Sequence, residues 1–147
     1  MKVLAVDPGE KRIGLAISDP TGTIARPLCV IQHEARSKDA KKIVEIAQAE
    51  GAVMIVVGQA LDSDGQIGHQ ARKSQRLAEA IRSEVNCEVR LWDESGTTQA
   101  AIQNRVTMGV SRKKRKGHLD DVAASVLLQD FLIINEQSVR NGIEIDE

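Results

Sequence analysis

The amino-terminal segment of this chain constrains its fold more than any other stretch. An uninterrupted apolar run at residues 3–6 ends at Asp7, and Pro8 and Gly9 follow at once. A run this short without polar residues predicts a strand that is covered on both faces, in the middle of a sheet. A second apolar run, at residues 13–17, follows after a short turn, so the two strands are expected to form an antiparallel hairpin.

Asp7 lies where this central strand is expected to end. A carboxylate there has a fixed backbone beneath it and an open crevice above it, which is where sheet proteins tend to hold ligands. An aspartate beside proline and glycine is also a common turn residue. The segment by itself leaves both interpretations of Asp7 open.

The rest of the chain alternates helices and strands. Three further strands are predicted at residues 23–31, 52–57 and 89–92, and helices at residues 38–50, 67–85, 98–108 and 118–137. Ser37 is expected to cap the first helix and Gly51 to end it. Pro27 favours an edge position for the strand that contains it. The strand at 52–57 follows a helix and should run parallel to the first strand.

This order of elements predicts an α/β fold. A three-strand antiparallel meander and two parallel strands would form a mixed five-stranded sheet flanked by helices. Residues 1–138 are expected to form a single domain, and residues 139–147 an acidic C-terminal tail.

Charge and composition exclude several classes of protein. The formal net charge is -1 over 147 residues, so nucleic acid would have to be held by a local basic patch. Trp92 and Phe131 are the only aromatic residues, which argues against base stacking as the binding mode. Cys29 and Cys87 lack metal-ligand spacing and are expected to be reduced thiols. No stretch is long and apolar enough to span a membrane, so we expect a cytoplasmic protein with no membrane partner.

Three acidic residues stand at the ends of predicted elements. Asp7 and Glu94 each follow a buried strand, and the ends of parallel strands meet at one edge of a sheet. Asp120 lies near the start of the last helix, in an apolar row that must face the sheet, so it is expected to point inward. That row holds Asp120, Ala124, Leu127, Phe131 and Ile134, whereas Asp121 shares a mixed row with Ser125, Leu128, Leu132 and Asn135.

Carboxylates that converge on one edge repel one another, and a hard divalent cation is the usual remedy. We therefore expect Mg²⁺ or Mn²⁺ at Asp7, Glu94 and Asp120, which would be both metal ligands and catalytic residues. A pair of such ions can activate water and stabilise an in-line displacement at phosphorus, so the predicted chemistry is phosphodiester hydrolysis. In the opposing interpretation Asp7 makes a turn, Glu94 forms a surface ion pair and Asp120 caps its helix.

Several short motifs, taken together, resemble the YqgF/RuvX family of RNase H-like nucleases, described as Holliday junction resolvases and as pre-16S rRNA nucleases. The resemblance spans nearly the whole chain, and it implies an RNase H-like fold with a metal-dependent site at Asp7, Glu94 and Asp120. It further implies the 5′ end of pre-16S rRNA as substrate, with four-way DNA junctions as the alternative. The motifs are Asp7-Pro8-Gly9 with Lys11-Arg12-Ile13-Gly14-Leu15-Ala16, Ser18-Asp19 with Ala25-Arg26-Pro27-Leu28, Ile55-Val56-Val57-Gly58 with Asp64-Gly65, Asp93-Glu94 with Thr97-Thr98, and Asp120 with Ala123-Ala124.

The chain departs from that family in two places. Ser95 and Gly96 stand where the family usually has arginine and leucine, and Gln59 and Ala60 where it usually has leucine and proline. Loss of an arginine beside the site would remove a bidentate phosphate contact. A catalytically silent nucleic-acid-binding module is therefore a second hypothesis.

A third hypothesis comes from the first glycines of the chain. Asp7-x-Gly9 followed by Gly14 also resembles the first phosphate motif of actin-like ATPases and sugar kinases. Those enzymes need two lobes that close on a nucleotide, and this chain supplies one.

Two basic segments are expected to contact nucleic acid. They are Lys11 and Arg12 in the hairpin turn, and the run Arg112, Lys113, Lys114, Arg115 and Lys116 before the last helix. Such a run is more often a solvated loop, but beside a phosphodiester site it would neutralise several phosphates. Arg72, Lys73 and Arg76 are interpreted as a solvated face that could extend this track.

His118 precedes Asp120 by two residues and is a candidate for proton transfer or for a helix cap. RNA is preferred over a DNA junction as partner, with recognition of backbone and shape. A resolvase would have to be a dimer, because two strands are cut symmetrically, so the chain is expected to be a monomer or a homodimer.

Overall fold

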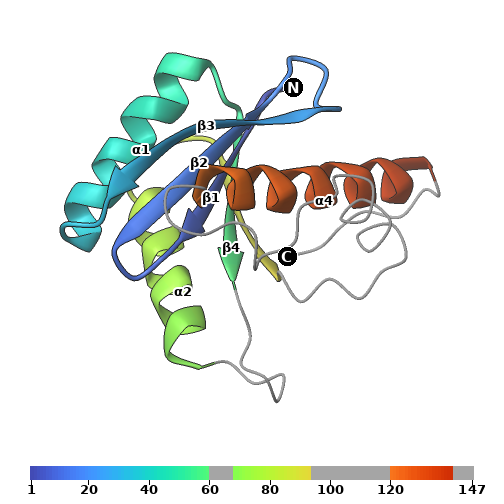
Figure 1. Ribbon diagram of the computed structural model, residues 1–147. Coiled ribbons are helices and arrows are strands. Elements are labelled where there is room, and N and C mark those ends of the chain that lie inside the picture. The colour runs from blue at the N-terminus through green and yellow to red at the C-terminus, as the bar shows by residue number, and fades with distance from the viewer. Residues whose placement is uncertain (60–67, 94–119, 141–147) are drawn as a thin grey trace.

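The computed structural model describes residues 1–59, 68–93 and 120–140, and for residues 120, 121 and 137–140 it describes the backbone (Figure 1). The strands are β1 (Val3–Pro8), β2 (Arg12–Ser18), β3 (Ala25–Gln32), β4 (Met54–Gln59) and β5 (Glu88–Asp93). The helices are α1 (Arg36–Glu50), α2 (His69–Arg82) and α4 (Asp120–Arg140). The helix predicted at 98–108 lies outside the described residues.

The five strands form one sheet in the order β3-β2-β1-β4-β5. β1 pairs antiparallel with β2 and parallel with β4, and β4 pairs parallel with β5. The mixed five-stranded sheet and the central position of β1 are therefore confirmed. β3, which contains Pro27, is an edge strand as predicted. Because β1, β4 and β5 are parallel, all three end at the same edge of the sheet.

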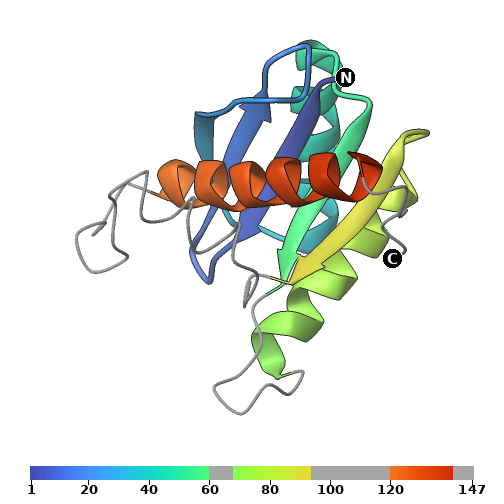
Figure 2. The same cartoon turned by 90° about the vertical axis from the view of Figure 1, so that its right-hand side faces the viewer.

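Helices cover both faces of the sheet. α1 and α2 pack on one face and α4 on the other (Figure 2). On the α1 and α2 face the strands supply large side chains and the helices supply several alanines; Leu4, Val6, Leu15, Ile17 and Ile55 meet Ala40, Ala47 and Ala78. On the α4 face small residues of the sheet meet large residues of the helix; Ala5 and Ala16 lie beneath Leu127, Leu128, Phe131 and Leu132.

The start of α1 differs from the prediction. Ala35 is its N-cap, no side chain caps it, and Ser37 lies inside the helix, so the expected Ser37 cap is wrong. The buried carboxylate of Asp39 instead binds the segment between β3 and α1. It accepts a hydrogen bond from the Glu34 N–H at 3.0 Å and pairs with the His33 ring. At the other end Gly51 has φ 73° and ends the helix as predicted.

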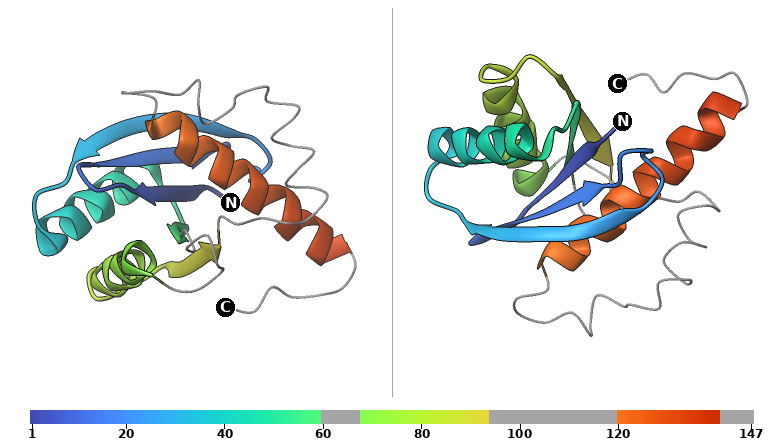
Figure 3. Two further views of the ribbon diagram at one scale, coloured as in Figure 1. Left: turned by 60° about the horizontal axis from the view of Figure 1, so that its bottom comes forward. Right: turned by 90° about the horizontal axis from the view of Figure 1, so that it is seen from above.

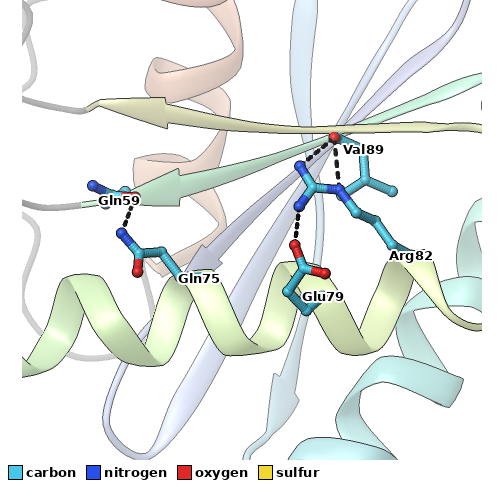
Figure 4. Close-up of polar contacts among 5 residues, drawn as sticks. All are labelled: Gln59, Gln75, Glu79, Arg82 and Val89. Atoms are coloured by element: carbon cyan, nitrogen blue, oxygen red, sulfur yellow. Dashed lines mark hydrogen bonds and ion pairs between the residues drawn. The ribbon is translucent and has the colours of Figure 1, made fainter.

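α2 is fastened to two strands by side chains (Figure 4). The Gln75 Nε2 donates to the Gln59 Oε1 at 3.4 Å, at the end of β4. The guanidinium of Arg82 donates to the Val89 carbonyl at 2.8 and 3.3 Å and pairs with Glu79. The helix ends at Arg82, three residues before the predicted end. Figures 1 and 2 show that its first half projects beyond the strand ends.

α4 begins at Asp120 and continues through Arg140, two residues past the boundary expected at 138. Figures 1 and 3 show that it lies across the strands and runs toward the end of the sheet at which β1 starts. Its first residue is thus nearer to the end of β1 than its last. Within the described ranges no helix has the length and hydropathy that crossing a membrane requires.

Candidate active site

Asp7 is the penultimate residue of β1 and is half-buried. Side chains alternate between the faces of a strand, and Val3 and Ala5 pack against α4. The side chain of Asp7 therefore lies on the α4 face, at the edge where β1, β4 and β5 end. The position predicted for this carboxylate is the one that the structure gives.

Glycines flank Asp7 on both neighbouring strands. Gly14 lies directly opposite it on β2, and Gly58 follows the β1–β4 pair formed by Val6 and Val57. Among the described glycines only Gly22 and Gly51 have positive φ, so the backbone does not require glycine at positions 14 and 58. A strand glycine without such a requirement often marks a place where a ligand approaches closely. The sheet surface on either side of the Asp7 carboxylate, formed by Gly14 and Gly58, thus carries no side chains. We call this surface the floor of the site.

The hairpin turn beside Asp7 is closed by a backbone bond. The Gly9 N–H donates to the Arg12 carbonyl at 2.9 Å, and a Cβ on Gly9 would lie 2.5 Å from that oxygen. Only glycine fits this contact without a shift of the backbone. The tight turn keeps Lys11 and Arg12 next to the sheet edge.

The two predicted phosphate contacts in this turn lie in different settings. Arg12 is half-buried and lies two residues from Gly14, on the same face as Asp7. Diagonal neighbours of this kind are about 7–8 Å apart, within reach of a long side chain. Lys11 is exposed, and its carbonyl accepts a hydrogen bond from the His33 N–H at 2.9 Å.

The far side of the floor is formed by β5. Trp92 lies opposite Gly58, half-buried, and its ring meets Phe131 of α4 edge to face with centroids 5.2 Å apart. β5 ends at Asp93, so Glu94 is the next residue along the chain and lies outside the described residues. Trp92 and the two glycines were missed as site residues, because their place beside Asp7 depends on strand pairing.

Asp120 is the first residue of α4, and its backbone alone is described. The structure buries both rows of this helix: Ala124, Leu127 and Phe131 in one, Ser125, Leu128 and Leu132 in the other. The row of Asp120 packs on the sheet as predicted, and the row of Asp121, which was predicted to be mixed, is buried as well, so α4 presents a broader face. The choice of Asp120 over Asp121 stays a prediction.

The other predicted site residues lie outside the described residues. They are Arg112, Lys113, Lys114, Arg115, Lys116 and His118, together with the departures at Ala60, Ser95 and Gly96. The remaining departure, Gln59, is described: it ends β4 and holds α2 through its bond to Gln75. Glutamine here has a structural role of its own.

One of the three predicted metal ligands can be compared with the ligand preference of a divalent cation. Within the described ranges no three histidine, cysteine, aspartate or glutamate residues form a metal-binding group. Of the predicted ligands only the Asp7 side chain is described, and it offers the carboxylate oxygens that Mg²⁺ and Mn²⁺ prefer. Asp7 fits a hard divalent cation.

Solved structures support the fold. Thermus thermophilus RuvC in complex with a Holliday junction is similar with a TM-score of 0.60 and 17% identity, covering 94% of this chain and 97% of that one. The fowlpox virus Holliday junction resolvase gives a TM-score of 0.51 and 16% identity, covering 93% and 99%. The chain therefore has the fold of the RuvC-like resolvases, which is RNase H-like as expected.

Sequence comparison identifies relatives over most of the chain. A Chloroflexus aurantiacus protein named "Putative pre-16S rRNA nuclease" is 41% identical over 130 residues, covering 88% of this chain and 85% of the relative. A Clostridium acetobutylicum protein of the same name is 36% identical over 132 residues, covering 90% and 98%. The family described as RuvX, Holliday junction resolvase, matches residues 1–133. The chain belongs to the RuvX family.

Proposed function

We propose that this protein is a divalent-metal-dependent endonuclease that hydrolyses phosphodiester bonds in structured nucleic acid. The observation that supports this most is the position of Asp7, between Gly14 and Gly58 at the edge where three parallel strands end. Because both flanking residues are glycines, no side chain of β2 or β4 at these positions would stand between this carboxylate and a phosphate group. Family membership directs the proposal to nuclease chemistry.

Glu94 and Asp120 complete the proposed site. Glu94 follows β5 directly, and two-residue alternation from Trp92 would carry it to the α4 face. Asp120 opens α4, at the end of that helix nearer to Asp7. With Asp7 they would hold Mg²⁺ or Mn²⁺. The metal would supply Lewis acidity at the phosphorus centre and a water of lowered pKa.

The basic residues are proposed to position the nucleic acid. Arg12, on the face that carries Asp7, would bind a phosphate next to the bond that is cut, and Lys11 would bind one farther along the strand. Residues 112–116 would extend this track. These contacts carry no sequence information, so shape and backbone would select the substrate.

The proposed substrate is pre-16S rRNA, cut at its 5′ end; the Chloroflexus and Clostridium relatives carry the name pre-16S rRNA nuclease, which supports the choice of this RNA. A four-way DNA junction is the second candidate, because the family description and the RuvC complex both concern Holliday junctions. A junction requires two symmetric cuts and hence a dimer, whereas trimming of one RNA end can be done by a monomer.

The test compares cleavage of a labelled pre-16S rRNA fragment and a labelled four-way junction with Mg²⁺, with Mn²⁺ and with chelator. The Asp7→Asn variant should cleave at least about a thousandfold more slowly, because several kcal/mol of charge stabilisation is lost. Asp19→Asn is the matched control: the same change at an aspartate-proline pair at the other end of β2, with cleavage expected to be unchanged.

Each outcome separates the hypotheses. Metal-dependent cleavage of the RNA alone supports the ribosomal substrate, and cleavage of the junction alone supports a resolvase. Cleavage that survives Asp7→Asn would contradict the proposed site. If neither substrate is cut with any metal although both bind with salt-dependent affinity, the silent binding module replaces the proposal.

A further inference from the structure

A shallow groove of about 530 Å³ lies between α1 and α2, on the face of the sheet opposite to α4. Its lining consists of Arg36, Gln75, Arg76, Glu79 and Ala80. Gln75 projects from α2 toward Gln59 at the end of β4, and Glu79 projects toward Arg82 (Figure 4). We call this feature the α1/α2 groove.

The charges in the α1/α2 groove are not balanced by the protein. Arg36 and Arg76 are both exposed, and within the described ranges neither has a hydrogen-bond or ion-pair partner. Among the described lining residues the one acid, Glu79, already pairs with Arg82. Two guanidinium groups thus line one groove whose described carboxylate is already engaged.

The position of Arg36 is not one that helix stability favours. Arg36 is the first residue of α1, and the first turn of α2 contains no acid, although Arg72 lies there. Cations near a helix N-terminus oppose the helix dipole, which prefers anions at that end. The acid in the first turn of α1, Asp39, is buried against His33. An anionic ligand bound to Arg36 would relieve this repulsion at the start of α1.

Side-chain hydrogen bonds join α2, which supplies most of the groove lining, to the proposed catalytic edge. The Gln70 Nε2 donates to the Glu10 Oε1 at 3.0 Å, which joins the start of α2 to the hairpin turn that carries Lys11. Gln75 lies in the groove lining and bonds Gln59 at the end of β4. The first half of α2 projects beyond the strand ends (Figures 1 and 2).

We propose that the α1/α2 groove binds the sugar-phosphate backbone of the nucleic-acid substrate, on the flank of the cleaved bond, through Arg36 and Arg76. This rests on the proposed function, since it assigns a second contact region to the same substrate. Arginine matches phosphate oxygens with two parallel hydrogen bonds, and the groove has no aromatic residue on which a base would stack. The contact is therefore independent of sequence and sensitive to salt.

The experiment measures binding alone. Fluorescence anisotropy gives the affinity of wild type and of Arg36→Gln/Arg76→Gln for the labelled RNA fragment and the labelled four-way junction, over a range of NaCl, with chelator present. Removal of two phosphate contacts should lower the slope of log K against log salt by about 1.4–1.8. The variant should therefore lose about tenfold less affinity than wild type between 50 and 200 mM salt.

Two further variants control for net charge and for folding. Lys41→Gln/Lys42→Gln removes two exposed cations from α1 that do not line the groove, and should leave the slope close to that of wild type. Arg36→Lys/Arg76→Lys keeps the charges and should keep most of the slope. An unchanged slope in Arg36→Gln/Arg76→Gln overturns the proposal and leaves the groove to an acidic protein. An equal fall in the Lys41→Gln/Lys42→Gln variant overturns it too, because the effect would then be general charge.

The result is independent of the cleavage test. The binding assay contains no metal. If the Arg36→Gln/Arg76→Gln variant has a lower salt slope but the wild-type protein cuts neither substrate, the groove proposal stands and the nuclease proposal is rejected. If the wild-type protein cleaves with metal but the variant has an unchanged salt slope, the nuclease proposal stands and the groove proposal is rejected.

Discussion

Asp7 and Asp19 are each followed by proline, and they stand at opposite ends of the meander formed by β1, β2 and β3. Asp19 is enclosed by its own loop: its carboxylate accepts hydrogen bonds from the N–H groups of Thr23 and Ile24, both at 2.8 Å, and from Thr21. At Asp7 the strand continues through Pro8, which pairs with Ile13, and the turn closes between Gly9 and Arg12.

The difference shows how to separate a turn aspartate from a site aspartate when the local sequence is alike. A turn aspartate lies outside the strand, and the next residues fold back to donate to its carboxylate. A site aspartate is still inside the ladder, so its side chain is directed by the pleat to a face of the sheet. Asp7 meets the second description and Asp19 the first.

Among the glycine substitutions, the largest expected loss of cleavage concerns the glycine opposite Asp7. Gly14→Ala places a methyl group on the floor of the site, and we expect cleavage to fall at least about tenfold, or 1.4 kcal/mol in activation free energy. Gly14 is buried, so the added methyl group must displace its neighbours, and we expect stability to fall by about 1–3 kcal/mol. Cleavage assays and urea unfolding measure the two effects, and Gly58→Ala should act in the same direction. Full activity in both variants would show that cleavage does not require glycine on either side of Asp7, and this contrast with Asp19 would be lost.

The next effect compares the glycines of the two turns. Gly9→Ala should cost about 1–3 kcal/mol, because its Cβ would meet the Arg12 carbonyl at 2.5 Å and the turn must open. Gly22→Ala should cost about 1–2 kcal/mol, because Gly22 has φ 71°. Urea unfolding measures both costs. Cleavage should decrease only in Gly9→Ala, since that turn carries Lys11 and Arg12; an equal decrease in Gly22→Ala would remove the contrast between the turns.

The smallest effect is the pH dependence of the Asp19 loop. Hydrogen bonds from Ile24, then from the Thr21 hydroxyl and from Thr23, hold the pKa of the Asp19 carboxyl well below its ordinary value of 3.8. A lowered pKa in the folded state stabilises the protein above the unfolded pKa, and this contribution is lost as the pH falls below 3.8. Thermal unfolding of wild type and Asp19→Asn should therefore differ most near neutral pH and converge in acid. A difference that grows in acid would contradict this account.

The strand order and the place of Asp7 could be predicted, because apolar runs, prolines and helical crossovers constrain pairing from sequence alone. The floor around Asp7 could not, because Gly14 and Gly58 lie far apart in the chain and become its neighbours through strand register. The Ser37 cap failed for a related reason. Asp39 reaches the Glu34 N–H, and such competition between nearby polar side chains is settled by tertiary geometry.

Helix faces were also predicted only in part. Val85 follows the apolar period of α2 and is half-buried against the core, yet the helix ends at Arg82, whose side chain bonds the Val89 carbonyl. In α4 the row of Asp121 looked mixed because it contains Ser125, but that hydroxyl donates to the Val122 carbonyl and is buried within the helix. The residue types in each row therefore predicted a narrower buried face of α4 than the structure shows.

The start of β3 has a consequence for how this protein behaves at high concentration. Gln129 of α4 accepts a hydrogen bond from the Ala25 N–H at 2.9 Å and donates to the Thr23 carbonyl at 2.9 Å. Two residues on, Pro27 has no N–H at all. Alternate residues of a strand direct their N–H groups to the same side. At two successive positions on the outer side of β3, Ala25 and Pro27, no N–H group is therefore available to a neighbouring strand. An extended segment of another molecule would find two donors fewer there, which disfavours strand addition and aggregation at the start of β3.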